Sequence, residues 1–458
     1  MSNMEKSKAI IMTDLSYGDT GKGTTTEWFA SHADSAAIVR FNGGGQAEHN
    51  IVRPDGTHHT FSQFGSASLL PNTVNHLSRD MWVNPLNMAP EAWHLQQLGV
   101  RDIWQRTTVS EEARIVTPYH RAGNRLRELA RGANAHGSTG QGIGEAGVDD
   151  IVRGDLTLRA GDVRRRDLVQ LLENIRMYKR EQMRSLGSML RTDTEEWDVL
   201  NDETLSEEYA DIYNEWSHVL RIVARDYLAT LALEHSHVIF EPAQGVLLDE
   251  KYGFHPHTTW SNTTPGNAEA QLRDIDFSGS VKKYGILRAY TTRHGYGPFV
   301  TEDEALDDPL YEYHNGVGEW QGKFRVGHFD PVAHRYAIQA VGELDGLVVT
   351  NVDRVVELPE WKYATGYNVP SDSAAGKYFD MHGSIARDMK LPQTGSKEHV
   401  EQLGKMLFEA KPVYGSIENP SADDVIKTIE REMGERVVLA SFGPTINDKK
   451  ILEDTILL

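Results

Sequence analysis

The stretch that decides the fold spans residues 10–26 and has the sequence IIMTDLSYGDTGKGTTT. An apolar run that ends in glycines, a lysine and hydroxyl residues predicts a buried strand that turns sharply into a helix, with backbone N–H groups free at the turn. Such a turn suits phosphate. The spacing differs from the common P-loop pattern, because only two residues separate Gly18 from Gly21, and Gly23 follows Lys22. An ordinary glycine turn before a helix is the alternative interpretation.

Asp19 is an unexpected residue in a turn that binds phosphate. Its carboxylate would repel a phosphate group unless a metal ion or a proton-transfer role required it there. The turn is therefore predicted to do more than hold an anion.

The composition sets limits on the class of protein. A chain of 458 residues with 39% hydrophobic content can bury a large core, either in one large α/β domain or in roughly two to four smaller ones. The absence of cysteine excludes disulfides, thiolate metal sites and a cysteine nucleophile, and it fits a cytoplasmic protein. No apolar run approaches the about 20 residues of a membrane span. A net charge of −20 opposes binding to nucleic acid or to an anionic membrane, so neither is an expected partner.

Along the chain, short apolar strands alternate with helices, which predicts an α/β fold with a central, mostly parallel sheet flanked by helices. Because strands come from both ends of the chain, we expect one domain over residues 1–458, with a helical subregion at 160–235. The expected strands are residues 36–40, 238–241, 285–290 and 436–440, and an apolar run that ends in Asn351-Val352-Asp353. The expected helices are residues 25–32, 90–131, 164–190, 206–234 with Ser206 as its N-cap, and 421–433.

Several loops between these elements carry residues suited to chemistry. The loop at 41–50, FNGGGQAEHN, places His49 after a glycine turn, where the histidine is either structural or directed into a cleft. Residues 136–144 join glycines to hydroxyls and either close on an oxyanion or form a plain linker. The loop at 322–330 is basic and suits closure on a carboxylate or phosphate. Asp353 can accept the two N–H donors of a guanine edge, with a helix N-cap as the alternative.

Taken in order, these segments resemble the adenylosuccinate synthetase family over nearly the whole chain. The matching motifs are Gly18 to Gly23, the loop ending at His49, Ser138 to Gly142, Ala243 to Asp249, Ser261 to Thr264, Thr292 to Phe299, and Gly443-Pro444. One such motif would be weak evidence, but the resemblance covers all of them in sequence order. It implies the family's α/β fold, related to that of P-loop proteins, and a ligase that joins L-aspartate to C6 of a 6-oxopurine nucleotide.

The resemblance also implies roles for individual residues. Asp19 would remove the N1 proton of the purine and His49 would support charge on O6, with Lys22 beside the transferring phosphoryl group. Mg²⁺ would be held by Asp19 and the backbone carbonyl of Glu48. The residues implied for the purine monophosphate are Ser138, Thr139, Arg153, Gln244, Thr259 and His294, with Arg153 supplied across a homodimer interface. Those implied for the triphosphate, ATP or GTP, are Gly21, Gly23, Thr24, Asn351, Asp353, Ser441 and Gly443. Lys323 and Arg325 are implied for L-aspartate.

Departures from the family pattern bear on the substrate. The segments 19–23, 138–142 and 442–448 resemble the phage branch of the family, which makes N6-succino-2-amino-2'-deoxyadenylate from dGMP for diaminopurine DNA. This resemblance favours dGMP as substrate, and the host cytoplasm as location if the protein is phage-encoded. Asp19 instead resembles the cellular enzyme, which makes IMP the alternative. Asn351 replaces the family's guanine-recognising lysine, so ATP and GTP both stay open. A nucleotide-binding switch without catalysis is the rival hypothesis.

Overall fold

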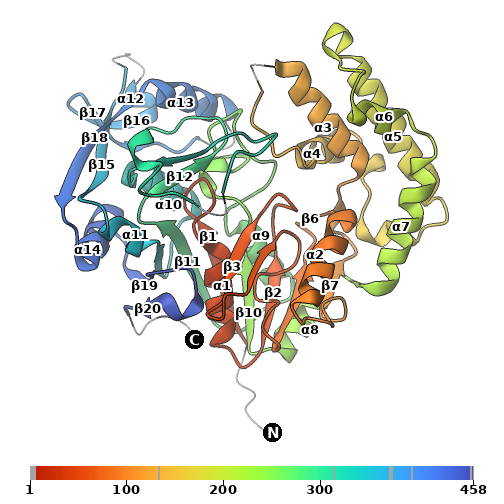
Figure 1. Ribbon diagram of the computed structural model, residues 1–458, viewed down its shortest axis with the longest axis horizontal. Helices are drawn as coiled ribbons and strands as arrows, with labels where there is room; N and C mark the ends of the chain where they lie inside the picture. Colours follow the sequence, from red (N-terminus) through yellow and green to blue (C-terminus); the bar gives the residue numbers. More distant parts are fainter. Residues whose placement is uncertain are drawn as a thin grey trace.

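The computed structural model describes residues 7–132, 135–312, 315–370, 375–393, 396–453 and 456, and its centre is a ten-stranded sheet (Figure 1). The strand order is β20-β19-β14-β11-β1-β10-β2-β5-β7-β9, and every neighbouring pair is parallel except β19 with β20. The strands are β1 (Lys8–Asp14), β2 (Ala36–Arg40), β5 (Thr73–Leu77), β7 (Thr107–Ser110), β9 (Arg221–Val223), β10 (His237–Glu241), β11 (Val281–Arg288), β14 (Gly346–Thr350), β19 (Val437–Ser441) and β20 (Lys449–Ile451). The predicted α/β fold with a mostly parallel sheet is confirmed.

Helices cover this sheet and smaller sheets extend it. The helices are α1 (Lys22–Ser31), α2 (Pro85–Gln97), α3 (Pro118–Arg131), α4 (Ile143–Val152), α5 (Leu168–Arg184), α6 (Glu195–Asn201), α7 (Leu205–Val219), α8 (Tyr227–Glu234), α9 (Gly266–Asp274), α10 (Pro331–Val341), α11 (Val352–Val356), α12 (Ala375–Tyr378), α13 (Lys397–Glu409) and α14 (Ala422–Met433). The smaller sheets pair β3 (His49–Val52) with β4 (His58–Phe61), β6 (Trp82–Val83) with β8 (Arg114–Ile115), and β12 (Thr291–His294) with β13 (Phe324–Gly327), and they join β15 (Glu360–Asn368), β16 (Phe379–His382), β17 (Ile385–Met389) and β18 (Lys411–Glu418). No helix in the described part of the chain is long and apolar enough to cross a membrane.

Two of the predicted helices are interrupted by strands. The helix expected over residues 90–131 is two helices, α2 and α3, with β7 and β8 between them. The β-branched run Thr107-Thr108-Val109 pairs with β5, so tertiary pairing outweighs the helical pattern. The helix expected over residues 206–234 likewise ends at Val219, and β9 joins β7 before α8 begins.

Ser206 does not cap α7, because the helix starts at Leu205, after Thr204. Its hydroxyl instead lies 2.8 Å from the Tyr119 hydroxyl and donates to Glu173 at 3.1 Å, so it serves packing between helices. The helix expected over residues 421–433 is α14, and Ser421 is its N-cap, since its side chain accepts from the Asp424 backbone N–H. Figure 1 shows α5, α6 and α7 grouped on one side of the molecule, within the predicted helical subregion 160–235. The single domain over residues 1–458 stays a prediction, and part of it lies outside the described residues.

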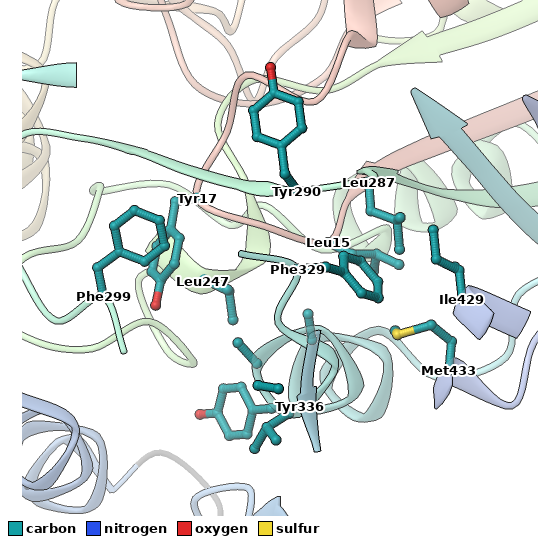
Figure 2. Close-up of a cluster of buried hydrophobic side chains, with 14 of the residues drawn as sticks. Leu15, Tyr17, Leu247, Leu287, Tyr290, Phe299, Phe329, Tyr336, Ile429 and Met433 are labelled. Carbon is teal, nitrogen blue, oxygen red and sulfur yellow. The ribbon is translucent and has the colours of Figure 1, made fainter. Parts of the chain in front are cut away.

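An apolar cluster packs directly behind the first glycine-rich turn (Figure 2). Leu15 and Tyr17 leave β1 and enter this cluster, where they meet Leu247 and Leu287. All four are buried, as expected beside a parallel sheet whose faces are both covered. The cluster therefore fixes the backbone on either side of the turn.

Candidate active site

A cleft of three adjoining cavities lies beyond the carboxyl ends of the central strands, where ligands bind in open α/β sheets. Cavity A has a volume of about 390 Å³, cavity B about 300 Å³ and cavity C about 440 Å³. Cavities A and B share Gln244 and His294 as walls, and cavities B and C share Asp19 and His49. The three cavities are therefore parts of one cleft.

The turn between β1 and α1 forms the boundary between cavities B and C. Gly18, Asp19 and Gly21 have φ values of 101°, 56° and 83°, so the turn needs left-handed backbone at three positions, one of which is not glycine. Asp14, at the end of β1, accepts hydrogen bonds from the Ser16 N–H at 2.8 Å, the Thr20 hydroxyl at 2.7 Å and the Lys22 ammonium at 2.7 Å. The Lys22 charge is thus compensated inside the turn, while its side chain borders cavities B and C.

His49 is held by a buried glutamate. Its Nδ1 lies 2.6 Å from Glu241 Oε1, and since a carboxylate only accepts, Nδ1 carries the proton. Ser66 also donates to Glu241, through its backbone N–H at 3.0 Å and through its hydroxyl. His49 Nε2 is buried without a hydrogen-bond partner, in a residue that borders cavities B and C. The structural interpretation of His49 is therefore weakened, because one nitrogen is anchored and the other is left for a ligand.

The protonation of this pair follows from its surroundings. Burial lowers the pKa of His49, against the hydrogen bond and charge of Glu241. Burial would raise the pKa of Glu241, but the Arg40 guanidinium and then the His49 hydrogen bond outweigh it and leave the pKa below its ordinary value. The free protein therefore holds a charged Glu241 beside a neutral His49, whose Nε2 is a free acceptor that can also take up a proton.

Cavity A collects five of the six residues expected to bind the monophosphate: Ser138, Thr139, Gln244, Thr259 and His294. The Gln244 amide is buried with neither its oxygen nor its nitrogen hydrogen-bonded, and Gln244 has a φ of 54°. His294 Nε2 is also buried and unpartnered. Buried polar atoms are normally hydrogen-bonded, so these atoms are arranged for a polar ligand.

Cavity C collects all the residues expected to bind the triphosphate: Gly21, Gly23, Thr24, Asn351, Asp353, Ser441 and Gly443. Asn351 occupies the N-cap position of α11 in a left-handed conformation, but its side chain makes no capping bond. Asp353 lies in the first turn of that helix, with Oδ1 buried and unpartnered, and burial raises the pKa of its carboxyl group. The cavity thus combines a glycine-rich turn with a buried, unpaired acceptor.

Three expected site residues do not border any of the three cavities. Lys323 is half exposed and pairs with Asp307 at 2.7 Å. Arg325 pairs with Glu302 at 2.7 Å and donates to the carbonyls of Gly295 and Gly297. Arg153 lies on the surface, paired with Asp155 at 2.9 Å. Their roles toward aspartate and across a dimer interface stay predictions.

The residues expected to bind Mg²⁺ lie together and offer a suitable set of donors. Asp19 and Glu48 both border cavities B and C. Mg²⁺ prefers oxygen ligands and is usually held by one or two carboxylates plus substrate phosphates. The Asp19 carboxylate and the Glu48 backbone carbonyl, beside the glycine-rich turn, fit that pattern.

Some residues of the site were missed at the level of sequence. Asp14, Glu241 and Arg288 each end a buried strand and each contact the cleft or its anchoring network. In the sequence, each of these residues is a charged residue at the end of an apolar run. That pattern could have identified them, because the last side chain of a parallel strand lies at the carboxyl edge of the sheet. Gln46, within the loop at 41–50, borders cavities A and B with an unpartnered buried oxygen.

Comparisons with known proteins agree on one family. The adenylosuccinate synthetase family model matches residues 11–449. The adenylosuccinate synthetase of Clostridium novyi is 31% identical over 446 residues, which cover 95% of this chain and 97% of that protein. The enzyme of Clostridium botulinum strain Alaska E43 is 33% identical over 391 residues, which cover 83% of this chain and 85% of that protein.

Two solved structures share the fold. Fully ligated adenylosuccinate synthetase from Plasmodium falciparum superposes with a TM-score of 0.75 at 20% identity and covers 97% of this chain and 99% of its own. The cyanophage S-2L succinoaminodeoxyadenylate synthetase, bound to dGMP and to dATP as an energy donor, gives a TM-score of 0.59 at 17% identity, with 98% and 97% covered.

Proposed function

Because the chain belongs to the adenylosuccinate synthetase family, a family of C–N ligases, we propose that it joins L-aspartate to C6 of a 6-oxopurine nucleoside monophosphate at the expense of a nucleoside triphosphate. The observation that carries the proposal is the arrangement of Asp19 and His49. Both border cavity B, which adjoins cavity A on one side and cavity C on the other. A reaction that transfers a phosphoryl group from one nucleotide to another needs such a meeting point.

In the proposed reaction the monophosphate occupies cavity A and directs its purine toward cavity B. The Asp19 carboxylate removes the proton on N1 and the electrons move to O6, which attacks the γ-phosphorus and releases the nucleoside diphosphate. The amine of aspartate then attacks C6 and expels the 6-phosphate, which leaves an N6-succinyl purine. An amide-like oxygen leaves poorly, and phosphorylation makes it a good leaving group.

His49 is proposed to stabilise the negative charge that develops on O6. With Nδ1 anchored on Glu241, a proton on Nε2 creates an imidazolium whose charge is offset by the buried carboxylate. Asp19 and the Glu48 carbonyl would hold Mg²⁺, which supplies charge neutralisation at the phosphates. Lys22, fixed by Asp14, adds a second cation at the same boundary.

For the monophosphate we propose dGMP, with IMP as the alternative. The dGMP proposal is supported by the motifs shared with the phage branch and by the fold likeness to a cyanophage enzyme bound to dGMP. The IMP alternative is favoured by Asp19 and by the names of the two curated relatives described above, both adenylosuccinate synthetases. We also propose a homodimer in which Arg153 serves the partner's site. Ile151 and Val152, at the end of α4, are 75% and 62% exposed and precede Arg153, as an interface would require.

The test is a competition among dGMP, GMP and IMP with aspartate, Mg²⁺ and ATP or GTP, read by mass spectrometry. We expect an aspartyl adduct of dGMP that requires all substrates and is absent with Asp19→Ala. An adduct from IMP alone would select the alternative. Triphosphate hydrolysis that needs neither monophosphate nor aspartate would instead indicate a nucleotide switch.

A further inference from the structure

Arg288 is a buried cation at the centre of the cleft that the proposed reaction leaves without a role. It is the last residue of β11, which lies between β1 and β14 in the sheet. The residue is 8% exposed and borders cavity C. An arginine stays charged at any ordinary pH, so its burial requires partners that compensate the charge.

Those partners form a compact network under the glycine-rich turn. The Arg288 guanidinium donates through Nε to the backbone carbonyl of Asp19 and through Nη1 to the Glu312 carboxylate. Nη1 also donates to the Tyr290 hydroxyl at 2.8 Å, and that hydroxyl donates in turn to Glu312. Figure 2 shows Tyr290 turning its hydroxyl away from the apolar cluster that holds its neighbours. One edge of the guanidinium is therefore clamped by Tyr290 and Glu312, and its Nε–H is aimed at Asp19.

The carbonyl that Arg288 holds belongs to a strained residue. Asp19 has a φ of 56°, a left-handed conformation that residues with a side chain adopt much less often than glycine does. Such a conformation persists only where its surroundings impose it. The next carbonyl, of Thr20, is likewise held from outside, by the Thr350 hydroxyl at 2.9 Å. Two neighbouring strands thus fix two successive carbonyls of the turn.

We propose that Arg288 is a positioning residue for Asp19: by fixing the Asp19 carbonyl, it keeps the carboxylate at the boundary of cavities B and C. The inference rests on the proposed function, in which that carboxylate takes the N1 proton. If the clamp loosens, the turn relaxes toward ordinary backbone angles and the carboxylate leaves the purine edge. A direct contact between Arg288 and the triphosphate is the competing explanation, because the side chain borders cavity C.

The main test is Arg288→Lys. The introduced ammonium keeps the positive charge beside Glu312. It lacks the planar guanidinium, whose separate N–H groups reach the Glu312 carboxylate and the Asp19 carbonyl at the same time. We expect kcat to fall about 10- to 100-fold, the range that corresponds to one lost hydrogen bond to a charged group. The KM of the monophosphate and the Kd of a non-hydrolysable triphosphate analogue, measured by calorimetry without Mg²⁺, should stay within about threefold, since neither then depends on the Asp19 carboxylate.

A second variant tests the same role in case Arg288→Lys does not fold. Tyr290→Phe keeps the ring and removes only the hydroxyl that joins Arg288 to Glu312, so we expect a smaller loss of kcat, about three- to tenfold, with the same unchanged KM and Kd. The matched control is Arg335→Lys, whose arginine holds the carbonyls of Glu432 and Arg387 far from the cleft. It should leave kcat unchanged.

The outcomes separate the inference from the proposed function. Wild-type protein that forms no aspartyl adduct refutes the proposed function before any variant is compared. If wild type is active, an unchanged kcat in a folded Arg288→Lys protein overturns the positioning role. A Kd for the triphosphate analogue weakened tenfold or more also overturns it and assigns Arg288 to phosphate binding. If Arg288→Lys does not fold, an unchanged kcat in Tyr290→Phe overturns it.

Discussion

Replacing Glu241 by glutamine tests the role of the buried pair most directly. The change removes one charge and keeps the shape of the side chain that receives the proton of His49 Nδ1 at 2.6 Å. The amide oxygen of the introduced glutamine can still accept that proton, so the imidazole ring keeps its orientation. What disappears is the charge that offsets an imidazolium during phosphoryl transfer.

The magnitude follows from the type of hydrogen bond. Hydrogen bonds to charged groups contribute about 1.5–3 kcal/mol and neutral ones about 0.5–1.5 kcal/mol, so roughly 1–2 kcal/mol is lost in the transition state. At 1.36 kcal/mol for each factor of ten, we expect kcat to fall about 5- to 30-fold. The KM of the monophosphate should change little, because Glu241 borders none of the three cavities.

The assay is the initial rate of succinyl-purine formation, with kcat and KM measured for each substrate and with thermal unfolding in parallel. Asp330→Asn is the control, because Asp330 is also a buried carboxylate, one that accepts from Tyr367 and borders none of the three cavities. It should alter stability without altering kcat. Equal losses of kcat in the two variants, or an unchanged kcat in Glu241→Gln, would refute the reasoning.

Three further predictions concern stability, base recognition and assembly. Burial raises the pKa of the Glu27 carboxyl group from 4.5 to about 7. In this pH range the folded state binds a proton that the unfolded state releases, so this contribution to stability is lost as the pH rises from about 4.5 to 7. Glu27→Gln should therefore reduce the fall in Tm between pH 5 and pH 8, and an unaltered fall in Tm would contradict this prediction. Asp353→Asn should raise the KM of GTP about 10-fold or more and that of ATP much less, since a carboxylate pairs with guanine N–H groups; equal effects on both would exclude base recognition. Mixing equal amounts of inactive Arg153→Ala and Asp19→Ala proteins should restore about a quarter of wild-type activity. Half of the dimers are then mixed, and each mixed dimer has one complete site and one site that lacks both residues. No recovery of activity would place Arg153 outside the partner's site.

Much of the fold was predictable because its signals are local. The apolar runs of β1, β2, β10 and β19 lie in strands buried on both faces, and each run is followed by a loop of glycines or polar residues. The helices over 90–131 and 206–234 were wrong for the opposite reason. Residues 107–110 and 221–223 become strands only because β5 and β7 offer edges to pair with, and those edges lie far away in the sequence.

In the candidate site, too, the residues in local motifs could be predicted from the sequence, and the contacts that depend on the fold could not. The family resemblance, carried by contiguous motifs, assigned most of the residues that border cavities A and C. The motifs did not predict that Lys323 pairs with Asp307 or that Arg325 pairs with Glu302, because an ion pair depends on which carboxylate the fold brings near.

By itself, the sequence determined the glycine-rich turn at residues 18–23 and its carboxylate, because the residues of that turn are contiguous and their backbone preferences are local. The tertiary structure decided what holds them. Asp14 pairs with Lys22 within the turn, but Glu241 meets His49 across 192 positions of the chain, and Arg288 meets the Asp19 carbonyl across 269. Partners so distant come together only when parallel strands align their carboxyl ends at one edge of the sheet, and that alignment is a property of the whole fold.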